Sequence, residues 1–395
     1  MVEKKYKDTT IGKLPSEWKY EELREHLQLL TDYDANGSFA DMANNVNTRW
    51  GFGYAWYVRA TDLEQKSSLN MVRYADENTY DFLSKSSLNG GEVLLAKRGE
   101  IGKVYFFQMK TKYATLGPNL YLLKLKNTIM PKFVYEYFCS EIGQEKLRAI
   151  NASTSLGAIY KEDVKSLLIP IPSINEQKAI VEALSSIDNL ILSLEKLIEK
   201  KKAIKQGVMQ KLLTGKTRLS GFSDEWKKLK LGDILSVGHG QNQKSIEKEN
   251  GKYKILATGG CIGYTDEFLW NKPSVLIGRK GTIDKPQYVD EPFWTIDTLF
   301  YTKIKEGYNA RCLFYYMQMI DWMNYNEASG VPSLSAKIIE KMEICIPKYD
   351  EQCEIAKTID SMDSEIVTLE SKLSKYRQIK QGMMQELLTG RIRLL

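Results

Sequence analysis

The sequence has little of what metal-binding and catalytic proteins depend on. It contains only two histidines, His26 and His239, and its five cysteines form no C-x-x-C pair. Because a zinc site needs clustered ligands and a disulfide framework needs an oxidising compartment, we interpret the cysteines as isolated thiols and expect no metal site. Two histidines also leave few groups for acid–base catalysis.

Long apolar runs are absent as well. The chain has no stretch of about 18 apolar residues, and its amino terminus, MVEKKYKDTTIGKLP, lacks the apolar core of a signal peptide. The sequence therefore predicts a cytoplasmic protein without a membrane span.

Motifs for nucleotide and cofactor chemistry are missing too. The stretch KLLTGKTRL contains Gly215-Lys216-Thr217, but a phosphate-binding loop needs a second glycine where this chain has Gln210. The sequence has neither the Asn/Asp-Pro-Pro-Tyr/Phe motif of an adenine methyltransferase nor a G-x-S-x-G elbow. We expect the chain to bind rather than to catalyse, and to hold no cofactor of its own.

What the chain has instead is a mild excess of positive charge and many aromatic groups. Lys and Arg number 56 against 50 acidic residues, giving a net charge of +6, beside 23 Tyr and 7 Trp. This mixture suits a polyanion partner, although a solvated basic surface has the same composition. A chain of 395 residues also has room for two or three folding units.

The sequence contains an internal repeat. Residues 169–219 align with residues 344–394 without a gap, and about 24 of the 51 positions are identical. Weaker matches continue upstream, such as VLLAKRGEIGK with VLIGRKGTIDK, and the offset between the copies falls from 208 at Trp18/Trp226 to 175 in the last segment. Each half is therefore a variable globular region followed by a tail of fixed length.

Each tail carries a heptad pattern of apolar residues. From Ile180 and from Ile355 the apolar residues recur at alternating spacings of four and three, which predicts two long helices that pack on each other in antiparallel fashion. Ser173 with Glu176 forms a capping-box pattern, and a Leu-Thr-Gly sequence follows each predicted helix end. A helix over residues 175–213 would be about 58 Å long. Pairing of each tail with another chain is the alternative.

Two glycines lie inside the predicted helices. Gly207 and Gly382 each follow the sequence Lys-Gln and cost about 1 kcal/mol relative to alanine. A close approach of the other helix or of a partner protein would explain them. The predicted positions for helix packing or partner binding are Gly207, Leu212, Leu213, Gly382, Leu387 and Leu388.

The two globular halves have the pattern of mixed α and β structure. Short β-rich runs punctuated by glycines predict strands at residues 92–97, 103–107, 120–125, 274–277 and 298–304. We expect one amphipathic helix in each half, over residues 131–150 and 310–325. The predicted fold is α+β, with two pseudo-repeated mixed α/β domains joined by two long antiparallel coiled-coil helices. The predicted boundaries are 1–168 and 221–343 for the domains, and 169–220 and 344–395 for the helical regions.

Basic residues recur beside a glycine at equivalent positions of the halves. Lys97-Arg98-Gly99 matches Arg279-Lys280-Gly281. Paired cations on a turn are suited to DNA phosphates or to guanine, and the flanking uncharged polar residues are suited to base edges. A solvated hairpin turn is the alternative. The predicted DNA contacts are Thr61, Lys97, Arg98, Lys103, Ser153, Thr154, Gln241, Asn242, Thr258, Gly259, Gly260, Arg279, Lys280, Lys285 and Ser329.

Two variable regions, each followed by a helical segment that begins near P-x-x-[ND]-E-Q and ends in [KR]-Q-G-x-M-Q-x-L-L-T-G, resemble the specificity subunit of type I restriction–modification systems. The resemblance spans the whole chain. It implies that each globular half is a target-recognition domain for one half of a split, asymmetric DNA sequence, and that the paired helices set the spacer between the half-sites.

The resemblance also implies partners. The helices would dock two modification subunits, which are adenine-N6 methyltransferases, and two restriction subunits, which are ATP-driven translocases with a nuclease domain, would complete the assembly on double-stranded DNA. On this interpretation the chain is not an enzyme. S-adenosylmethionine, ATP and magnesium would bind to the partner subunits.

Two other functions stay open on the sequence alone. A coiled-coil scaffold whose globular heads bind proteins would use the same heptads, and it would have no DNA affinity with its partners present. A self-contained nuclease or methyltransferase is the third hypothesis, but a metal site made from Glu92, Lys97 and Glu100 has no matching acidic set in the second half.

Overall fold

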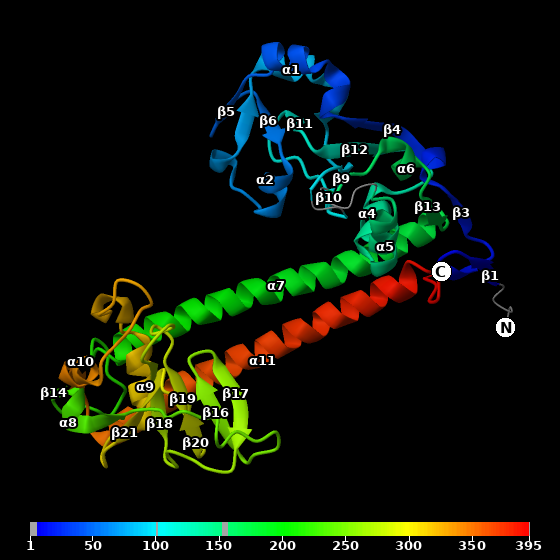
Figure 1. Cartoon of the computed structure of the whole chain (residues 1–395). Helices are drawn as coiled ribbons and strands as arrows, with labels where there is room; N and C mark the ends of the chain where they lie inside the picture. The colour runs from blue at the N-terminus through cyan, green and yellow to red at the C-terminus, as the bar shows by residue number, and fades with distance from the viewer. Residues whose placement is uncertain (1–5, 100–101, 152–156, 395) are drawn as a thin grey trace. The chain divides into compact units, whose positions relative to one another are not determined.

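The chain forms two compact units in the computed structural model, which describes residues 6–99, 102–151 and 157–394. Unit 1 comprises Met1–Ser193 with Leu373–Leu395, and unit 2 comprises Leu194–Lys372. Each unit therefore contains one globular half together with a part of both tails (Figure 1).

The tails are two helices of 39 residues each, α7 (Ile174–Leu212) and α11 (Tyr349–Leu387). In unit 1, Lys380 of α11 donates to Asp188 of α7 at 2.9 Å. In unit 2, Lys201 of α7 donates to Glu365 of α11, also at 2.9 Å. Residue numbers rise along one helix as they fall along its partner, so the predicted antiparallel pairing is confirmed.

The heptad residues form the buried sides of these helices. Ile180, Leu184 and Ile187 of α7 are buried in unit 1, and Ile355 and Ile359 of α11 are buried in unit 2. Burying such side chains stabilises the folded state by about 2 kcal/mol each. The periodicity of the sequence therefore identified the helix faces correctly.

Unit 1 contains two larger sheets, in the strand orders β10-β9-β12-β4 and β5-β7-β6-β11-β8. Strands β6 and β11 run parallel, and the other neighbours within these sheets are antiparallel. Two-stranded sheets pair β1 with β2 and β3 with β13. The strands are β1 Tyr6–Thr9, β2 Gly12–Pro15, β3 Lys19–Glu22, β4 Leu27–Asp32, β5 Thr48–Trp50, β6 Ala55–Val58, β7 Arg73–Ala75, β8 Ser87–Leu88, β9 Val93–Ala96, β10 Val104–Phe106, β11 Ala114–Leu116, β12 Leu120–Leu125 and β13 Leu168–Ile171.

Unit 2 repeats this plan with fewer strands, in the orders β15-β21-β18-β19 and β17-β16-β20, beside a β14-β22 pair. Strands β16 and β20 are parallel, as β6 and β11 are in unit 1. Strands β5 and β8 have no counterpart in the three-stranded sheet of unit 2. The strands are β14 Lys227–Lys230, β15 Leu235–Gly238, β16 Tyr253–Ala257, β17 Gly260–Thr265, β18 Ser274–Gly278, β19 Gln287–Val289, β20 Phe293–Thr295, β21 Leu299–Ile304 and β22 Glu343–Ile346.

The prediction of one amphipathic helix in each half was wrong in detail. In unit 1 the segment forms two helices, because Ser140 adopts an extended backbone and its Oγ accepts a hydrogen bond from the backbone N–H of Gly143 at 3.2 Å. The helices of unit 1 are α1 Phe39–Asn45, α2 Ala60–Glu64, α3 Glu77–Phe82, α4 Pro131–Cys139, α5 Glu141–Ala149 and α6 Lys161–Lys165, with 3-10 turns η1 Leu23–His26, η2 Tyr33–Asn36, η3 Leu69–Met71 and η4 Ser84–Ser86. Those of unit 2 are α8 Leu231–Ile234, α9 Ala310–Gln318 and α10 Ala336–Lys341, with η5 Trp322–Tyr325.

Candidate nucleic-acid and partner interfaces

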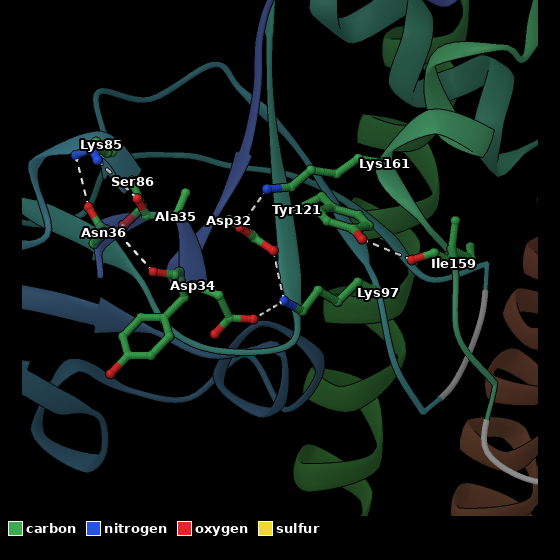
Figure 2. Close-up of polar contacts among 11 residues, drawn as sticks. Asp32, Asp34, Ala35, Asn36, Lys85, Ser86, Lys97, Tyr121, Ile159 and Lys161 are labelled. Carbon is green, nitrogen blue, oxygen red and sulfur yellow. Dashed lines mark hydrogen bonds and ion pairs between the residues drawn. The ribbon is translucent and has the colours of Figure 1, made fainter. Parts of the chain in front are cut away.

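Lys97, one of the predicted DNA contacts, belongs to a buried ion-pair cluster (Figure 2). Its Nζ lies 2.8 Å from Oδ2 of Asp32 and also contacts Asp34, while Nζ of Lys161 lies 2.8 Å from Oδ1 of Asp32. The side chains of Lys97 and Asp32 are only 9% and 7% exposed. The ammonium group is therefore not available to a DNA phosphate in this structure, and we leave Lys97 out of the candidate interface.

The cluster keeps its charges. Burial by itself raises the pKa of Asp32, but hydrogen bonds from Lys161 and Lys97 outweigh burial, and the pKa lies below the ordinary value. Burial likewise lowers the pKa of Lys97, but the bonds to Asp32 and Asp34 outweigh it and raise the pKa. The cluster joins the end of β4, the residue after β9, the turn η2 and the start of α6.

The two basic turns are alike in backbone but differ in charge. In unit 1, the backbone of Arg98 forms an isolated antiparallel β-bridge with Ala158. In unit 2, Lys280 forms the equivalent β-bridge with Ser333, so each turn lies against a second loop. Arg279, which aligns with Lys97, is exposed, and its Nη1 donates to the backbone oxygen of Asp297 at 3.2 Å. Unit 2 therefore presents two exposed cations on this turn, whereas unit 1 presents Arg98.

The other predicted contacts are scattered over both units. Thr61 is exposed on α2, and Lys103 forms an ion pair with Glu64 at 3.0 Å. In unit 2, the exposed side chains include Gln241, Asn242 and Ser329, and Thr258-Gly259 forms the turn between β16 and β17, which begins at Gly260. Ser153 and Thr154 lie outside the described residues. Lys285 is exposed, but it lines a groove beside α7.

The sequence did not point to a cleft in unit 1 that three arginines line. Arg59, Arg73 and Arg98 share a cleft of about 770 Å³ with residues of η2 and α1. The three arginines come from different elements, so no single motif contains them. Arg59 and Arg73 each follow a valine, in VRA and VRY, and Arg98 lies in the predicted basic turn, so only Arg98 had a local signal.

Each tail begins with a glutamate that is bound by an arginine from the end of the other tail. In unit 1, Arg393 donates from Nη2 to Glu176 at 2.9 Å and also from Nε, and Trp18 Nε1 donates to the same carboxylate at 2.9 Å. In unit 2, Arg218 donates to both oxygens of Glu351 at 2.6 Å. We call these two ion pairs the clasps.

The clasp changes one prediction about the helix start. Ser173 Oγ accepts from the backbone N–H of Glu176 at 3.3 Å, as a capping box requires. The Glu176 carboxylate binds Trp18 and Arg393, so the second half of the predicted box does not form.

The glutamine that follows each of these glutamates ties the tail to a globular half. Gln177 Oε1 accepts from the backbone N–H of Met130, which precedes α4, at 2.8 Å. Gln352 Oε1 accepts from the backbone N–H of Asn309, which precedes α9, at 2.8 Å. The E-Q motif is thus explained by contacts within each unit.

Both units contain a groove between the repeated tail sequence and the end of the adjoining domain helix. The groove in unit 1 has a volume of about 700 Å³ and the groove in unit 2 about 760 Å³. Four tail residues are identical in the two grooves and occupy matching positions in the repeat: Lys380, Gln381, Met384 and Gln385 in unit 1, and Lys205, Gln206, Met209 and Gln210 in unit 2. We call these the twin grooves.

The helix glycines and leucines have different environments. Leu212 and Leu213 are buried in unit 2, and Leu387 and Leu388 are buried in unit 1, so they pack within the chain. A methyl group added at Gly207 or Gly382 would meet no atom within 4 Å among the described residues. A close approach of the other helix therefore does not explain the glycines, and contact with a partner stays a prediction.

Within the described parts of the chain, no three His, Cys, Asp or Glu side chains are grouped so that they could hold a metal ion. Glu92, proposed above for a nuclease site, accepts from the backbone N–H groups of Asn89 and Gly90 at 2.7 and 2.8 Å. Glu100 lies outside the described residues. A search of the described helices found none that combines the length and the hydropathy of a membrane span.

Residues 15–206 and 223–380 match the family model described as the type I restriction modification DNA specificity domain. The chain is 24% identical over 345 residues to the type I restriction enzyme MjaVIII specificity subunit of Methanocaldococcus jannaschii, covering 78% of this chain and 77% of that protein. It is also similar to the type I restriction–modification S subunit from M. genitalium, with a TM-score of 0.62, 17% identity and coverage of 94% and 96% of the two chains. A chain from a structural study of type I R-M complex assembly gives a TM-score of 0.60 at 14% identity and covers 96% of this chain and 99% of its own length.

Proposed function

The chain belongs to the type I restriction–modification DNA specificity family, and from this we propose how its parts divide the recognition of DNA and of partner subunits. It is a DNA sequence-specificity subunit that assembles with other subunits of a type I system. In this proposal the catalytic sites belong to the partner subunits. The chain therefore determines the DNA sequence on which the partner subunits act.

The proposed target is a split and asymmetric sequence in double-stranded DNA, with one half-site for each globular half. The difference between the halves supports the asymmetry. The aligned turns present different cations, since Lys97 is held by Asp32 while Arg279 is exposed, and unit 1 has the strands β5 and β8 that unit 2 lacks. Two globular halves with different surfaces select different bases.

The proposed partners are two modification subunits, one at each of the twin grooves. Two copies of one protein need two equivalent surfaces, and Gln206 and Gln210 in unit 2 have identical counterparts, Gln381 and Gln385, in unit 1. All four side chains are exposed. Gly207 and Gly382 lie beside them with open space around their Cα atoms, so a partner helix can approach each tail closely there.

Chemistry belongs to the partners in this proposal. Methylation of adenine with S-adenosylmethionine would occur on the modification subunits, and two restriction subunits would use ATP and magnesium for translocation and cleavage. The chain itself would bind none of these cofactors, and the complex would work in the cytoplasm.

The family match over residues 15–206 and 223–380 is the observation that supports this function most strongly. The test is selection from a pool of random duplexes by the purified complex of this chain with its modification subunit at raised salt. We expect enrichment of one split sequence, because phosphate contacts weaken with salt while base contacts continue to discriminate. Equal retention of all duplexes would contradict the proposal.

Docking is tested separately by the mass of the assembled complex. Gln206→Trp should fill the groove of unit 2, and Gln381→Trp should fill the groove of unit 1, so each variant should bind one modification subunit and the double variant none. Lys178→Trp, at an exposed site on α7, is the control and should bind two. Loss of both subunits from each single variant would mean that the grooves are not independent docking sites.

A further inference from the structure

The arginine cleft of unit 1 is built on elements that unit 2 does not have. Between β4 and β6, unit 1 contains η2, α1 and β5, whereas unit 2 has no helix or strand between the corresponding strands β15 and β16. Strand β5 pairs with β7, and Arg73 is the first residue of β7. The lining residues on η2, α1 and β5 therefore belong to structure that is specific to the first half.

The cations of the cleft are held in place and remain open to a ligand. Arg59 donates to Asp62 from Nε and Nη2, and Arg73 donates from Nη1 to Thr48 Oγ1 at 3.0 Å. Within the described residues, neither Arg73 nor Arg98 forms an ion pair with a carboxylate. Asp34, the acidic residue that lines the cleft, pairs with Lys97, so two of the three guanidinium groups form no ion pair with the acid of the cleft.

An exposed tryptophan fixes two of these arginines. The guanidinium carbons of Arg59 and Arg73 lie 4.8 and 5.1 Å from the ring centroid of Trp50, which is 54% exposed. Such cation–π contacts restrain the arginines without removing their positive charge. Phe39, which is 92% exposed, also lines the cleft.

The lining fits one class of ligand. All basic residues of the cleft are arginines, whose planar fork of donors matches phosphate oxygens and the O6/N7 edge of guanine. Asn119 and Thr48 add uncharged donors and acceptors. A ligand with negative charge, flat apolar faces and polar edges is a nucleic acid, and a volume of about 770 Å³ admits a base edge with its flanking phosphate.

We propose that this cleft is the base-reading surface of the first half, with Arg73 and Arg98 as specificity-determining residues and Arg59 and Trp50 as positioning residues. The first half-site would thus be read by the inserted elements η2, α1 and β5 together with β7, and the second by the turn that carries Arg279 and Lys280. The inference rests on the proposed function, because it assigns a DNA surface within a specificity subunit.

The experiment maps methylated adenines in a host without adenine methylation of its own, using this chain with its modification subunit. For Arg73→Ala we expect relaxed preference at one or two base pairs of one half-site, with discrimination reduced about five- to a hundredfold, and the other half-site unchanged. Arg24→Ala, an exposed arginine of unit 1 outside the cleft, is the matched control and should leave both half-sites unchanged.

The outcomes separate the inference from the function it rests on. If the wild-type complex methylates no split sequence, the proposed function fails. If Arg73→Ala and Arg98→Ala both keep the wild-type preference at both half-sites, the assignment of the cleft is wrong. If Arg73→Ala abolishes methylation altogether, the same measurement is made on Arg73→Lys. Relaxed preference at one half-site of that variant supports the assignment of the cleft. Unchanged preference at both half-sites, or equal relaxation at both, overturns the assignment.

Discussion

At the scale of single residues, neighbouring cations in the sequence have different roles. Lys97 and Arg98 are adjacent in a turn that recurs in both halves, and the sequence predicts the same role for both. The structure separates them, because the Lys97 ammonium group is bound to Asp32 and Asp34 while the Arg98 side chain is exposed. The acidic residues that bind Lys97 are more than 60 positions earlier in the chain. The sequence around the turn therefore contains no information about them.

Substitution of these two residues should have opposite effects. Lys97→Met should lower the free energy of unfolding by about 3 kcal/mol, because it removes one partner of a buried ion pair, and should leave the salt dependence of DNA binding unchanged. Arg98→Ala should leave stability within about 0.5 kcal/mol and reduce the slope of log K against log salt by about 0.9 if it meets a phosphate. Urea unfolding and DNA titrations at several salt concentrations measure both. Equal stability of the two variants would contradict the structural role of Lys97.

The same cluster gives a pH dependence whose sign follows from Asp32. Its pKa is lowered in the folded state, so its contribution to stability is present above the ordinary aspartate pKa of about 3.9 and is lost as pH falls through the lower folded value. The stability difference between the wild type and Asp32→Asn should therefore be largest near neutral pH and shrink below about pH 4. Urea unfolding across this range checks the trend, and a difference that grows on acidification would contradict it.

At the scale of elements, the tails were predictable because their signal is local. A heptad pattern specifies the buried face of a helix wherever the partner comes from, and α7 and α11 begin and end within about a residue or two of the expected positions. The clasps were not predictable in this way, since Glu176 and Arg393 are 217 positions apart. The only indication in the sequence was that the glutamate and the arginine are identical in both copies of the repeat. The arginine cleft depends on three separate elements and had no comparable signal.

The clasps should couple the start of each tail to the end of the other. A double-mutant cycle of Glu176→Ala and Arg393→Ala should give a coupling energy of about 2 kcal/mol, because Glu176 is buried and accepts more than one charged hydrogen bond. Glu351→Ala with Arg218→Ala should also show favourable coupling, stronger than that of an exposed ion pair. The exposed pair Lys178 and Glu182, at 3.9 Å, is the control and should couple by less than about 0.5 kcal/mol. Coupling at the clasps as weak as in the control would contradict this view.

At the scale of the whole molecule, duplication with divergence explains which features the halves share. The E-Q contacts, the clasps and the twin grooves recur in both units, and they use residues that the two copies keep identical. The two globular halves differ in the cations of the aligned turns and in inserted elements. In the proposed function, the chain combines a repeated framework for common partners with two unlike surfaces for DNA.

Replacement of the first globular half should change one half-site only. A chain in which residues 1–168 come from another specificity subunit should direct methylation to a new first half-site joined to the original second one, because each half reads its own bases. Adenine methylation of the hybrid complex can be compared with that of both parents. A change in both half-sites would mean that the halves do not read independently.

The central claim is that this chain selects the DNA sequence on which its partners act. Its most direct measurement is the genome-wide pattern of methylated adenines in a host that carries the modification subunit, with and without this chain. We expect methylation at a single split, non-palindromic sequence that appears only when the chain is present. Methylation that is the same in both hosts, or that follows no sequence, would contradict it.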